Sequence, residues 1–444
     1  MFSKIVIFIS LLFTTSFSFG QSNLGHWSSD KVGLPTFNYT GEIPYKVTAL
    51  GGEVLNYPKD PWFLLGNYGI TAFVHTSGVF DLYTLRRAWG RLNVSTKNSP
   101  STIAKINVDG NEHTITGLGS EIARKAEKVF GTGFANFKMQ ITKNVYCERT
   151  ISTAPSQKIN TGNGALLITV NLTNLGKETH QIEYSETVLA NYQMIGELRI
   201  SYSAVPTNKG EYLSAEYKPH TDTTIIWQDK EKASTYDFYP PKLFIKGNAE
   251  TFYKFSNGKN EDVNLSANNK FTLKPGENKT ITYVVGYKFD GENINEMANT
   301  LFEQGAEAPK FRNAWKEKLP DYSWQKDKVT KREQYWNTYV LEASAKYNTY
   351  FEETFIPQGM TYDYVWGLNA VARDHLHYSL PANYFNPELS KSIIRFVLKV
   401  MFPSGAFNYN VNGYGYNVPN LWSPSDLQLH LLQLIMKRPY GCFP

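Results

Sequence analysis

Residues 358–430 read QGMTYDYVWGLNAVARDHLHYSLPANYFNPELSKSIIRFVLKVMFPSGAFNYNVNGYGYNVPNLWSPSDLQLH, and this stretch decides how the chain folds. It predicts a helix from Pro387 to Phe402, because Asn386 is a good helix cap and Pro is favoured at the first helical position. Ser423 and Pro424 open another helix in the same way. Acidic, aromatic and amide side chains precede these helices. The stretch therefore predicts consecutive helices with polar groups at their N-terminal ends.

Helical periodicity extends upstream to about Asn293. NINEMANTLFEQ, APKFRNAWKEKL and KREQYWNTYVLEASAKYNTYF each place apolar or aromatic residues about one turn apart. We assign residues 299–354 to a helical linker and residues 355–444 to the start of a helical domain.

The pattern before residue 298 is different. Short alternating or β-branched runs are separated by turns, as in KINVDGNEHTITG and KFTLKPGENKTITYVVGYKF. Asp109-Gly110 supplies a hairpin turn, and Pro275-Gly276 marks another. Residues 30–298 are therefore predicted to form a large antiparallel β-sandwich.

The first 20 residues resemble a secretory signal. Lys4 precedes the apolar run IVIFISLLF, small and polar residues follow, and Gln21 is a suitable mature start. The apolar run is well short of the roughly 20 residues that a membrane-spanning helix needs. We expect a secreted or periplasmic protein without a membrane span.

Composition excludes some function classes. The net charge of +5 is spread without basic blocks, so no nucleic-acid partner is expected. Cys147 and Cys442 lack metal-type spacing, and nothing else in the sequence supports a disulfide between them. No metal or cofactor is expected. The 29 Tyr and 9 Trp suit stacking on sugars, although such rings are also ordinary core residues.

Several segments, in order, resemble the cellobiose-phosphorylase-like glycoside hydrolases, family ninety-four and its relatives. The matching runs are GNYGITAFVHTSGVFDLYTLRRAWGRLN, FGTGFANFKMQITKNVYCERTISTAP, GALLITVNLTNLGKETHQIEYSETVLA and the linker-like WKEKLPDY. The resemblance implies an N-terminal β-super-sandwich, a helical linker and an (α/α)6 barrel. The resemblance covers most of the chain. Each motif alone matches only weakly, and the order of the motifs along the chain makes the resemblance specific.

The same resemblance implies a role for Arg373 and Asp374. They fall where the family has an Arg-Asp pair whose Asp binds hydroxyls of the sugar in the non-reducing-side subsite. One carboxylate can accept hydrogen bonds from two vicinal hydroxyls. Alternatively, Asp374 caps the following helix and Arg373 pairs with it. At Tyr378 the chain departs from the family, since many phosphorylases carry a second Asp there.

Further candidate binding residues surround this pair. If the segment is helical, Asp363, Trp366, Asp374 and His377 share one face, because 11 residues are close to three turns. The family has no match for Asp363, and a structural hydrogen bond would explain it equally well.

Two candidate binding residues lie downstream. Asp426 falls where the family has an acidic pair, although helix dipoles also favour an acid there. Tyr414 lies in the run Gly413–Tyr416, which is a candidate loop over the same end of the helices. Polar turn-forming residues also occur in loops without a binding role.

The barrel implied by the resemblance is longer than this segment. Twelve helices need roughly 190 residues, far more than residues 361–444. The family's general acid lies downstream of this point, so no catalytic residue is assigned, and we expect a truncated product of a longer gene. An unfinished barrel would leave apolar helix residues exposed, among them Leu389, Ile393, Phe396, Val397 and Val400.

Taken together, these patterns predict a secreted glycoside hydrolase that in full-length form acts on a β-linked glucan or oligosaccharide by an inverting mechanism. Two alternatives stay open, a non-catalytic carbohydrate-binding protein and an inverting glycoside phosphorylase. Export favours hydrolysis, because it removes the protein from the cell's phosphate. A homodimer of the full-length form is compatible with the resemblance.

Overall fold

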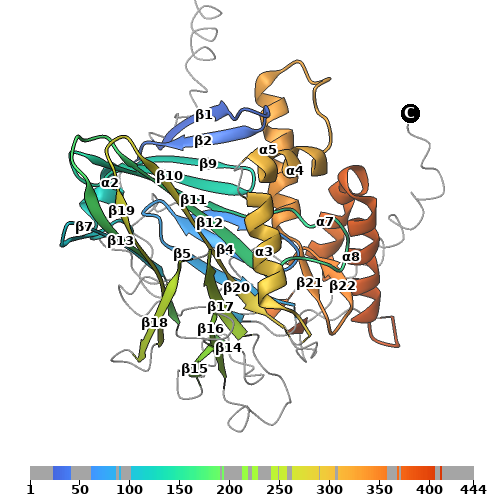
Figure 1. Ribbon diagram of the computed structural model, residues 1–444. Helices are drawn as coiled ribbons and strands as arrows, with labels where there is room; N and C mark the ends of the chain where they lie inside the picture. Colours follow the sequence, from blue (N-terminus) through green and yellow to red (C-terminus); the bar gives the residue numbers. More distant parts are fainter. Residues whose placement is uncertain are drawn as a thin grey trace, which may run out of the picture.

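A computed structural model describes residues 24–41, 62–86, 90–91, 102–190, 193–194, 213–218, 223–228, 242–248, 250–257, 263–289, 291–305, 309–357, 368–369, 372–405 and 411–412. The strands form antiparallel sheets, as predicted, and Figure 1 shows them as a β-rich body with helices along one side. The largest sheet has ten strands. In spatial order they are β1 (Gly25–Ser29), β2 (Pro35–Tyr39), β9 (Glu127–Gly131), β10 (Phe134–Gln140), β11 (Val145–Ser152), β12 (Ala165–Asn174), β20 (Asn278–Lys288), β17 (Lys242–Gly247), β16 (Thr223–Gln228) and β15 (Leu213–Lys218).

Two five-stranded sheets and two short strand pairs complete the β structure of the described residues. One sheet orders β18 (Phe252–Asn257), β19 (Val263–Leu273), β13 (His180–Ala190), β7 (Thr102–Val108) and β8 (Asn111–Thr114). The other orders β14 (Gln193–Met194), β6 (Gly90–Arg91), β5 (Phe80–Thr84), β4 (Thr71–His75) and β3 (Trp62–Gly66). The pairs are β21 (Lys346–Asn348) with β22 (Glu353–Phe355), and β23 (Leu368–Asn369) with β24 (Val411–Asn412).

Both predicted turns are present. Asp109 and Gly110 have φ values of 53° and 90° and join β7 to β8, the conformation of a two-residue hairpin turn. Gly276 has φ of 70° between β19 and β20. Positive φ is the reason that Asn, Asp and Gly mark such turns in a sequence.

The three large sheets share one hydrophobic core, to which alternate residues of strands such as β7, β12 and β13 contribute. A buried ion pair crosses it between two sheets. Arg149 of β11 donates from Nη2 to Oε1 of Glu186 in β13 at 2.5 Å, and both side chains are fully buried. Tyr184 donates to the other oxygen of Glu186 at 2.9 Å. Each charge is thus paired and hydrogen-bonded, as burial requires.

Cys147 lies in the same core as a free thiol. Burial raises its pKa to about 12. Its sequence counterpart Cys442 lies outside the described residues.

The longer helices lie along one side of the β body (Figure 1). Apart from the short α2 (Glu121–Lys125), the described helices come after the strands of the three large sheets in the sequence. They are α3 (Ile294–Gly305), α4 (Pro309–Lys318), α5 (Lys328–Ser344), α7 (Ala372–Phe385) and α8 (Pro387–Lys399). Leu301 and Phe311 of α3 and α4 pack on Leu167 and Val284 of the ten-stranded sheet. Tyr339 of α5 packs in a separate cluster near β3. None of these helices is long and apolar enough to cross a membrane.

The helix that was predicted through KREQYWNTYVLEASAKYNTYF ends earlier, at Ser344. The following residues form β21 because their backbone groups bond to the β body. Tyr347 N donates to Tyr68 O at 2.8 Å, and Thr349 N donates to Arg86 O at 2.6 Å. Nothing in the local periodicity indicates these distant partners.

The helix α8 begins as predicted. Asn386 caps it by accepting from Leu389 N at 3.1 Å, and Pro387 is its first residue, but it ends at Lys399 rather than Phe402. The expectation of an exposed apolar row is wrong. All five of its residues are buried, at 7% exposure or less, namely Leu389, Ile393, Phe396, Val397 and Val400. The β21–β22 hairpin covers part of this face, with the Phe355 and Phe396 rings stacked at 4.0 Å.

Candidate functional site

The N-terminal end of α7 carries Asp374 in its first turn. The side chain is half-buried, and no other described residue forms a hydrogen bond or ion pair with it. A helix N-terminus favours negative charge, so the carboxylate is stabilised there without a cationic partner. Both of its oxygens are available to a ligand as far as the described residues go.

A strand pair joins this helix end to a distant segment. Leu368 pairs with Asn412 and Asn369 with Val411, three residues or more before α7 begins. The pairing places Val411 and Asn412 beside Leu368 and Asn369, which precede α7 in the sequence. The sequence predicted a loop over this end of the helices, but it contained no signal for the pairing of β23 with β24.

His375 anchors the start of α7 from the buried side. Its Nδ1 is hydrogen-bonded to the carbonyl oxygen of Ile356, and Phe355 and Phe396 contact the ring edge-to-face. Burial lowers the pKa of His375 to about 3, so the imidazole is neutral and Nδ1 is the donor. Because His375 faces the core, its neighbour Asp374 is directed elsewhere on the helix.

A second anchor fixes the other end of the α7–α8 hairpin. Glu342 of α5 is 2% exposed and accepts from Tyr68 Oη at 2.5 Å and from Asn386 Nδ2 at 2.7 Å. Lys318 Nζ lies 3.7 Å from the same carboxylate. Burial and the Glu342 charge raise the pKa of Tyr68 well above its usual range, so the phenol stays a donor. These residues connect the β body, the linker helices and α8. Sequence reasoning identified only Asn386 among them, as a helix cap, and missed its bond to Glu342.

A third anchor is Glu353 in β22. It accepts from Ser392 at 2.7 Å and from Arg395 Nε at 2.9 Å, both in α8. Burial opposes ionisation of Glu353, yet the bonds from Arg395, Ser392 and Lys399 outweigh it and lower its pKa. The three anchors together connect α7 and α8 to the rest of the described protein.

The structure describes only some of the predicted site residues. Asp374 is among them, with its side chain half-buried. Arg373 lies in α7, but its side chain is outside the description, and four further candidates lie outside the described residues, namely Asp363, Trp366, Tyr414 and Asp426. The helical stripe proposed through residues 363–377 is wrong, because Leu368 and Asn369 form a strand and α7 begins only at Ala372. His377 is exposed on α7.

No metal centre is evident in the described part of the chain, where no three His, Cys, Asp or Glu side chains gather closely enough to hold an ion.

Comparison with known proteins supports the fold. No protein-family model matches the chain, and no curated protein matches its sequence. Among solved structures, a protein assigned as a kojibiose phosphorylase from the human microbiome is similar with a TM-score of 0.52 and 10% identity. The similarity covers 93% of this chain and 56% of that one, so this chain spans little more than half of its length. The protein thus has a fold like that of a glycoside phosphorylase.

Two other structures are similar over less of the chain. An aldose 1-epimerase homologue from Klebsiella pneumoniae has a TM-score of 0.32 and 9% identity, covering 61% of this chain and 88% of its own. A heparan sulfate lyase from Pedobacter heparinus has a TM-score of 0.28 and 11% identity, covering 55% and 38%. These scores are too low to support an argument about function.

Proposed function

We propose that this protein is carbohydrate-active and binds a saccharide at the N-terminal end of α7. The observation that carries the proposal is Asp374, a half-buried carboxylate without a partner among the described residues. It follows β23 by five residues in the sequence, in a chain whose fold resembles that of a glycoside phosphorylase. We further propose that the helices belong to an (α/α)6 barrel and that Asp374 accepts hydrogen bonds from two vicinal hydroxyls of a pyranose.

The remaining candidates are assigned to the same site from sequence. Trp366 and Tyr414 lie two positions in sequence from β23 and β24. We propose that they stack on the ring of the sugar. Arg373 is the proposed companion of Asp374, with Asp363 and Asp426 as further carboxylates.

The preferred reaction is inverting hydrolysis of a β-linked glucan or oligosaccharide by a secreted or periplasmic protein. Inversion needs one carboxylic acid to protonate the leaving oxygen and a base to activate water on the opposite face. Asp363 and Asp426 are the first residues to test for these roles. Phosphorolysis and binding without catalysis are the alternatives.

Titration of the protein with β-linked gluco-oligosaccharides tests the site. Asp374→Asn keeps the shape of the side chain but removes its charge. We expect it to weaken binding or turnover by about 1–3 kcal/mol, the usual cost of losing hydrogen bonds to a charged group.

Glu388→Gln is the matched control, because Glu388 is also a first-turn carboxylate but belongs to α8. It should leave saccharide binding unchanged. Equal affinity of the Asp374→Asn variant and the parent for every saccharide tested would refute the assignment. Turnover that requires phosphate would identify a phosphorylase, and binding without turnover would identify a binding protein.

A further inference from the structure

The loop between α4 and α5 presents an exposed tryptophan. Trp324 is 66% exposed, whereas every other tryptophan side chain that the structure describes is buried or half-buried. Figure 1 shows this loop at the outer end of the two helices. A single exposed aromatic residue is ordinary on a protein surface, so the surroundings of Trp324 decide what it can do.

The loop is fixed by hydrogen bonds on both sides of Trp324. Tyr322 N donates to Tyr335 Oη at 3.2 Å, and the Tyr322 hydroxyl is hydrogen-bonded to Thr338 Oγ1 at 2.8 Å. Gln325 N donates to Tyr322 O at 3.1 Å. Tyr322 thus packs inward on α5 while Trp324 stays exposed, so little conformational entropy remains to be lost when the indole binds a ligand.

Positive charge gathers around this indole. Residues 324–332 contain four basic side chains and one acidic side chain. Lys326 and Lys328 are exposed and Lys331 is half-buried, and none of the three forms an ion pair or hydrogen bond with another described residue. Lys328 and Lys331 are three residues apart in α5, so they lie on the same side of the helix.

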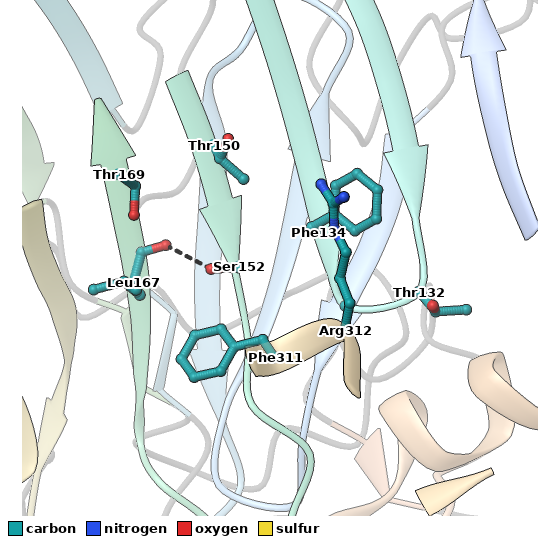
Figure 2. A pocket seen from close by; sticks show the side chains of 9 residues that line it. Thr132, Phe134, Thr150, Ser152, Leu167, Thr169, Phe311 and Arg312 are labelled. Carbon is teal, nitrogen blue, oxygen red and sulfur yellow. Dashed lines mark hydrogen bonds between the residues drawn. The ribbon is translucent and has the colours of Figure 1, made fainter. Parts of the chain in front are cut away.

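The other basic residues nearby are engaged. Figure 2 shows Arg312 of α4 extending over the ring of Phe134, and its guanidinium carbon is 4.2 Å from the ring centroid. Lys316 Nζ donates to a tyrosine hydroxyl of α5 at 2.7 Å. Arg332 is paired with Glu333 at 2.6 Å. The three lysines differ from these residues in being available to a ligand as far as the described residues go.

The acidic side chains beside the loop are also engaged. Asp321 accepts from Ser323 N at 2.9 Å and from Ser323 Oγ at 2.7 Å. Asp327 accepts from Thr330 N at 2.6 Å and caps α5. Neither carboxylate pairs with a lysine among the described residues. They reduce the positive potential of the three lysines without cancelling it.

Trp324, Lys326, Lys328, Val329 and Lys331 form what we call the tryptophan–lysine patch. Only Trp324 and Val329, which is 55% exposed, supply large apolar surface in it. Protein interfaces bury about 800 Å² per partner and are poor in lysine at their centres. A sugar ring, by contrast, needs one aromatic face and a few polar groups at its edge. The composition of the patch therefore favours a glycan over a protein.

We propose that the tryptophan–lysine patch binds an acidic polysaccharide, with the indole of Trp324 stacked on a uronic acid ring and the lysines paired with its carboxylates. A uronic acid carries a face for stacking and a negative charge on one residue, as an indole flanked by lysines requires. The proposal rests on the proposed carbohydrate activity for the class of ligand. It uses none of the residues at α7 and adds a second, non-catalytic attachment site.

Calorimetric titration with oligogalacturonates at low ionic strength tests the proposal. We expect saturable binding that Trp324→Ala weakens about tenfold. The double variant Lys326→Gln, Lys328→Gln should weaken it several-fold and make it less sensitive to salt, because fewer ion pairs are left to screen. Thermal stability should stay the same in both variants, since the three side chains are exposed.

Two matched controls should keep full affinity. Tyr350→Ala removes another exposed ring, at 60% exposure. Lys270→Gln with Lys274→Gln removes the same charge from two exposed lysines in and after β19. Absence of saturable binding overturns the proposal, and so does equal affinity of Trp324→Ala and the parent. Equal losses in the two double-lysine variants would mean that only net charge attracts the glycan, which also overturns it.

Further probes separate this site from α7 and from other ligands. Asp374→Asn should bind oligogalacturonates like the parent, and Trp324→Ala should bind neutral gluco-oligosaccharides like the parent, so either site can fail alone. Loss of oligogalacturonate binding in Asp374→Asn would overturn a separate patch. Tighter binding of dextran sulfate, oligothymidylate or phosphatidylglycerol vesicles at the same ionic strength would identify a sulfate, nucleic acid or membrane ligand and overturn the assignment to a uronate.

Discussion

At the scale of single residues, His375 and Asp374 show how adjacent side chains take opposite roles. His375 is fully buried between Phe355 and Phe396, while Asp374 is half-buried at the helix end. A helix turns about 100° per residue, so neighbours in sequence face different surroundings. One residue fixes the helix and the next is left for a ligand.

Burial of His375 predicts a pH dependence of stability. Its pKa is about 3 in the folded protein and about 6.5 when unfolded, so the unfolded chain binds more protons between these values. The stability contribution is complete above pH 6.5 and is lost as pH falls towards 3. We expect a loss of about 2 kcal/mol between pH 7 and pH 5 from this residue. Urea unfolding at both pH values should show that His375→Gln lacks this component.

His377→Gln is the control, because His377 is exposed two residues further along α7. It should keep the pH dependence of the parent. If His375→Gln and the parent lose the same free energy between pH 7 and pH 5, the imidazole is not the group responsible.

At the scale of elements, α8 depends on contacts at both ends and along one face. Asn386 caps it and also bonds to Glu342, while Arg395 bonds to Glu353. Its apolar face packs on the β21–β22 hairpin, which the sequence patterns did not predict. The hairpin covers part of the apolar row of α8, and α7 packs against the same helix.

The two functions of Asn386 can be separated by mutation. Ser caps helices about as well as Asn, but it lacks the amide that donates to Glu342. We therefore expect Asn386→Ser to lower the free energy of unfolding by about 1.5–3 kcal/mol, the value of a hydrogen bond to a buried charged group. Chemical denaturation measures the change.

Asp327→Ser provides the comparison, since Asp327 caps α5 through Thr330 N and is exposed. That change should cost no more than about 0.5 kcal/mol, because one good cap replaces another. Equal costs at the two caps would mean that the bond between Asn386 and Glu342 contributes nothing.

At the scale of the whole molecule, helices and sheets form joint cores. Phe311 and Leu301 share a cluster with Leu167 and Val284, and Trp315 shares another with Leu34. Burial of such side chains contributes roughly 1.5–3 kcal/mol each. The linker helices are therefore part of the β body rather than a free connection to α7 and α8.

This packing predicts the result of limited proteolysis. The sequence indicates cleavage near residues 306–309, between α3 and α4, and a stable β-rich core of residues 30–298. Because Phe311 and Trp315 are buried against the sheets, we expect the cleaved fragments to stay associated. They should co-elute in size-exclusion chromatography and separate only on a denaturing gel.

Preferential cleavage within residues 102–190 would contradict this expectation, and so would release of a free helical fragment under native conditions.

Local chemistry was enough to predict several elements of this protein from sequence. The Asp109-Gly110 and Pro275-Gly276 turns, the Asn386 cap and the helices α3 and α4 follow from backbone preferences that act over a few residues. The start of a helix at Asp374 was only an alternative in the sequence analysis, beside a helical stripe through residues 363–377.

Only the tertiary structure decided the strand order, the buried pair Arg149–Glu186, the Glu342 anchor, and the pairing of Leu368 with Asn412. These features join residues that are tens to hundreds of positions apart. Their partners are chosen by packing and by the need to satisfy buried polar groups across the whole molecule, and no short segment of sequence contains that information.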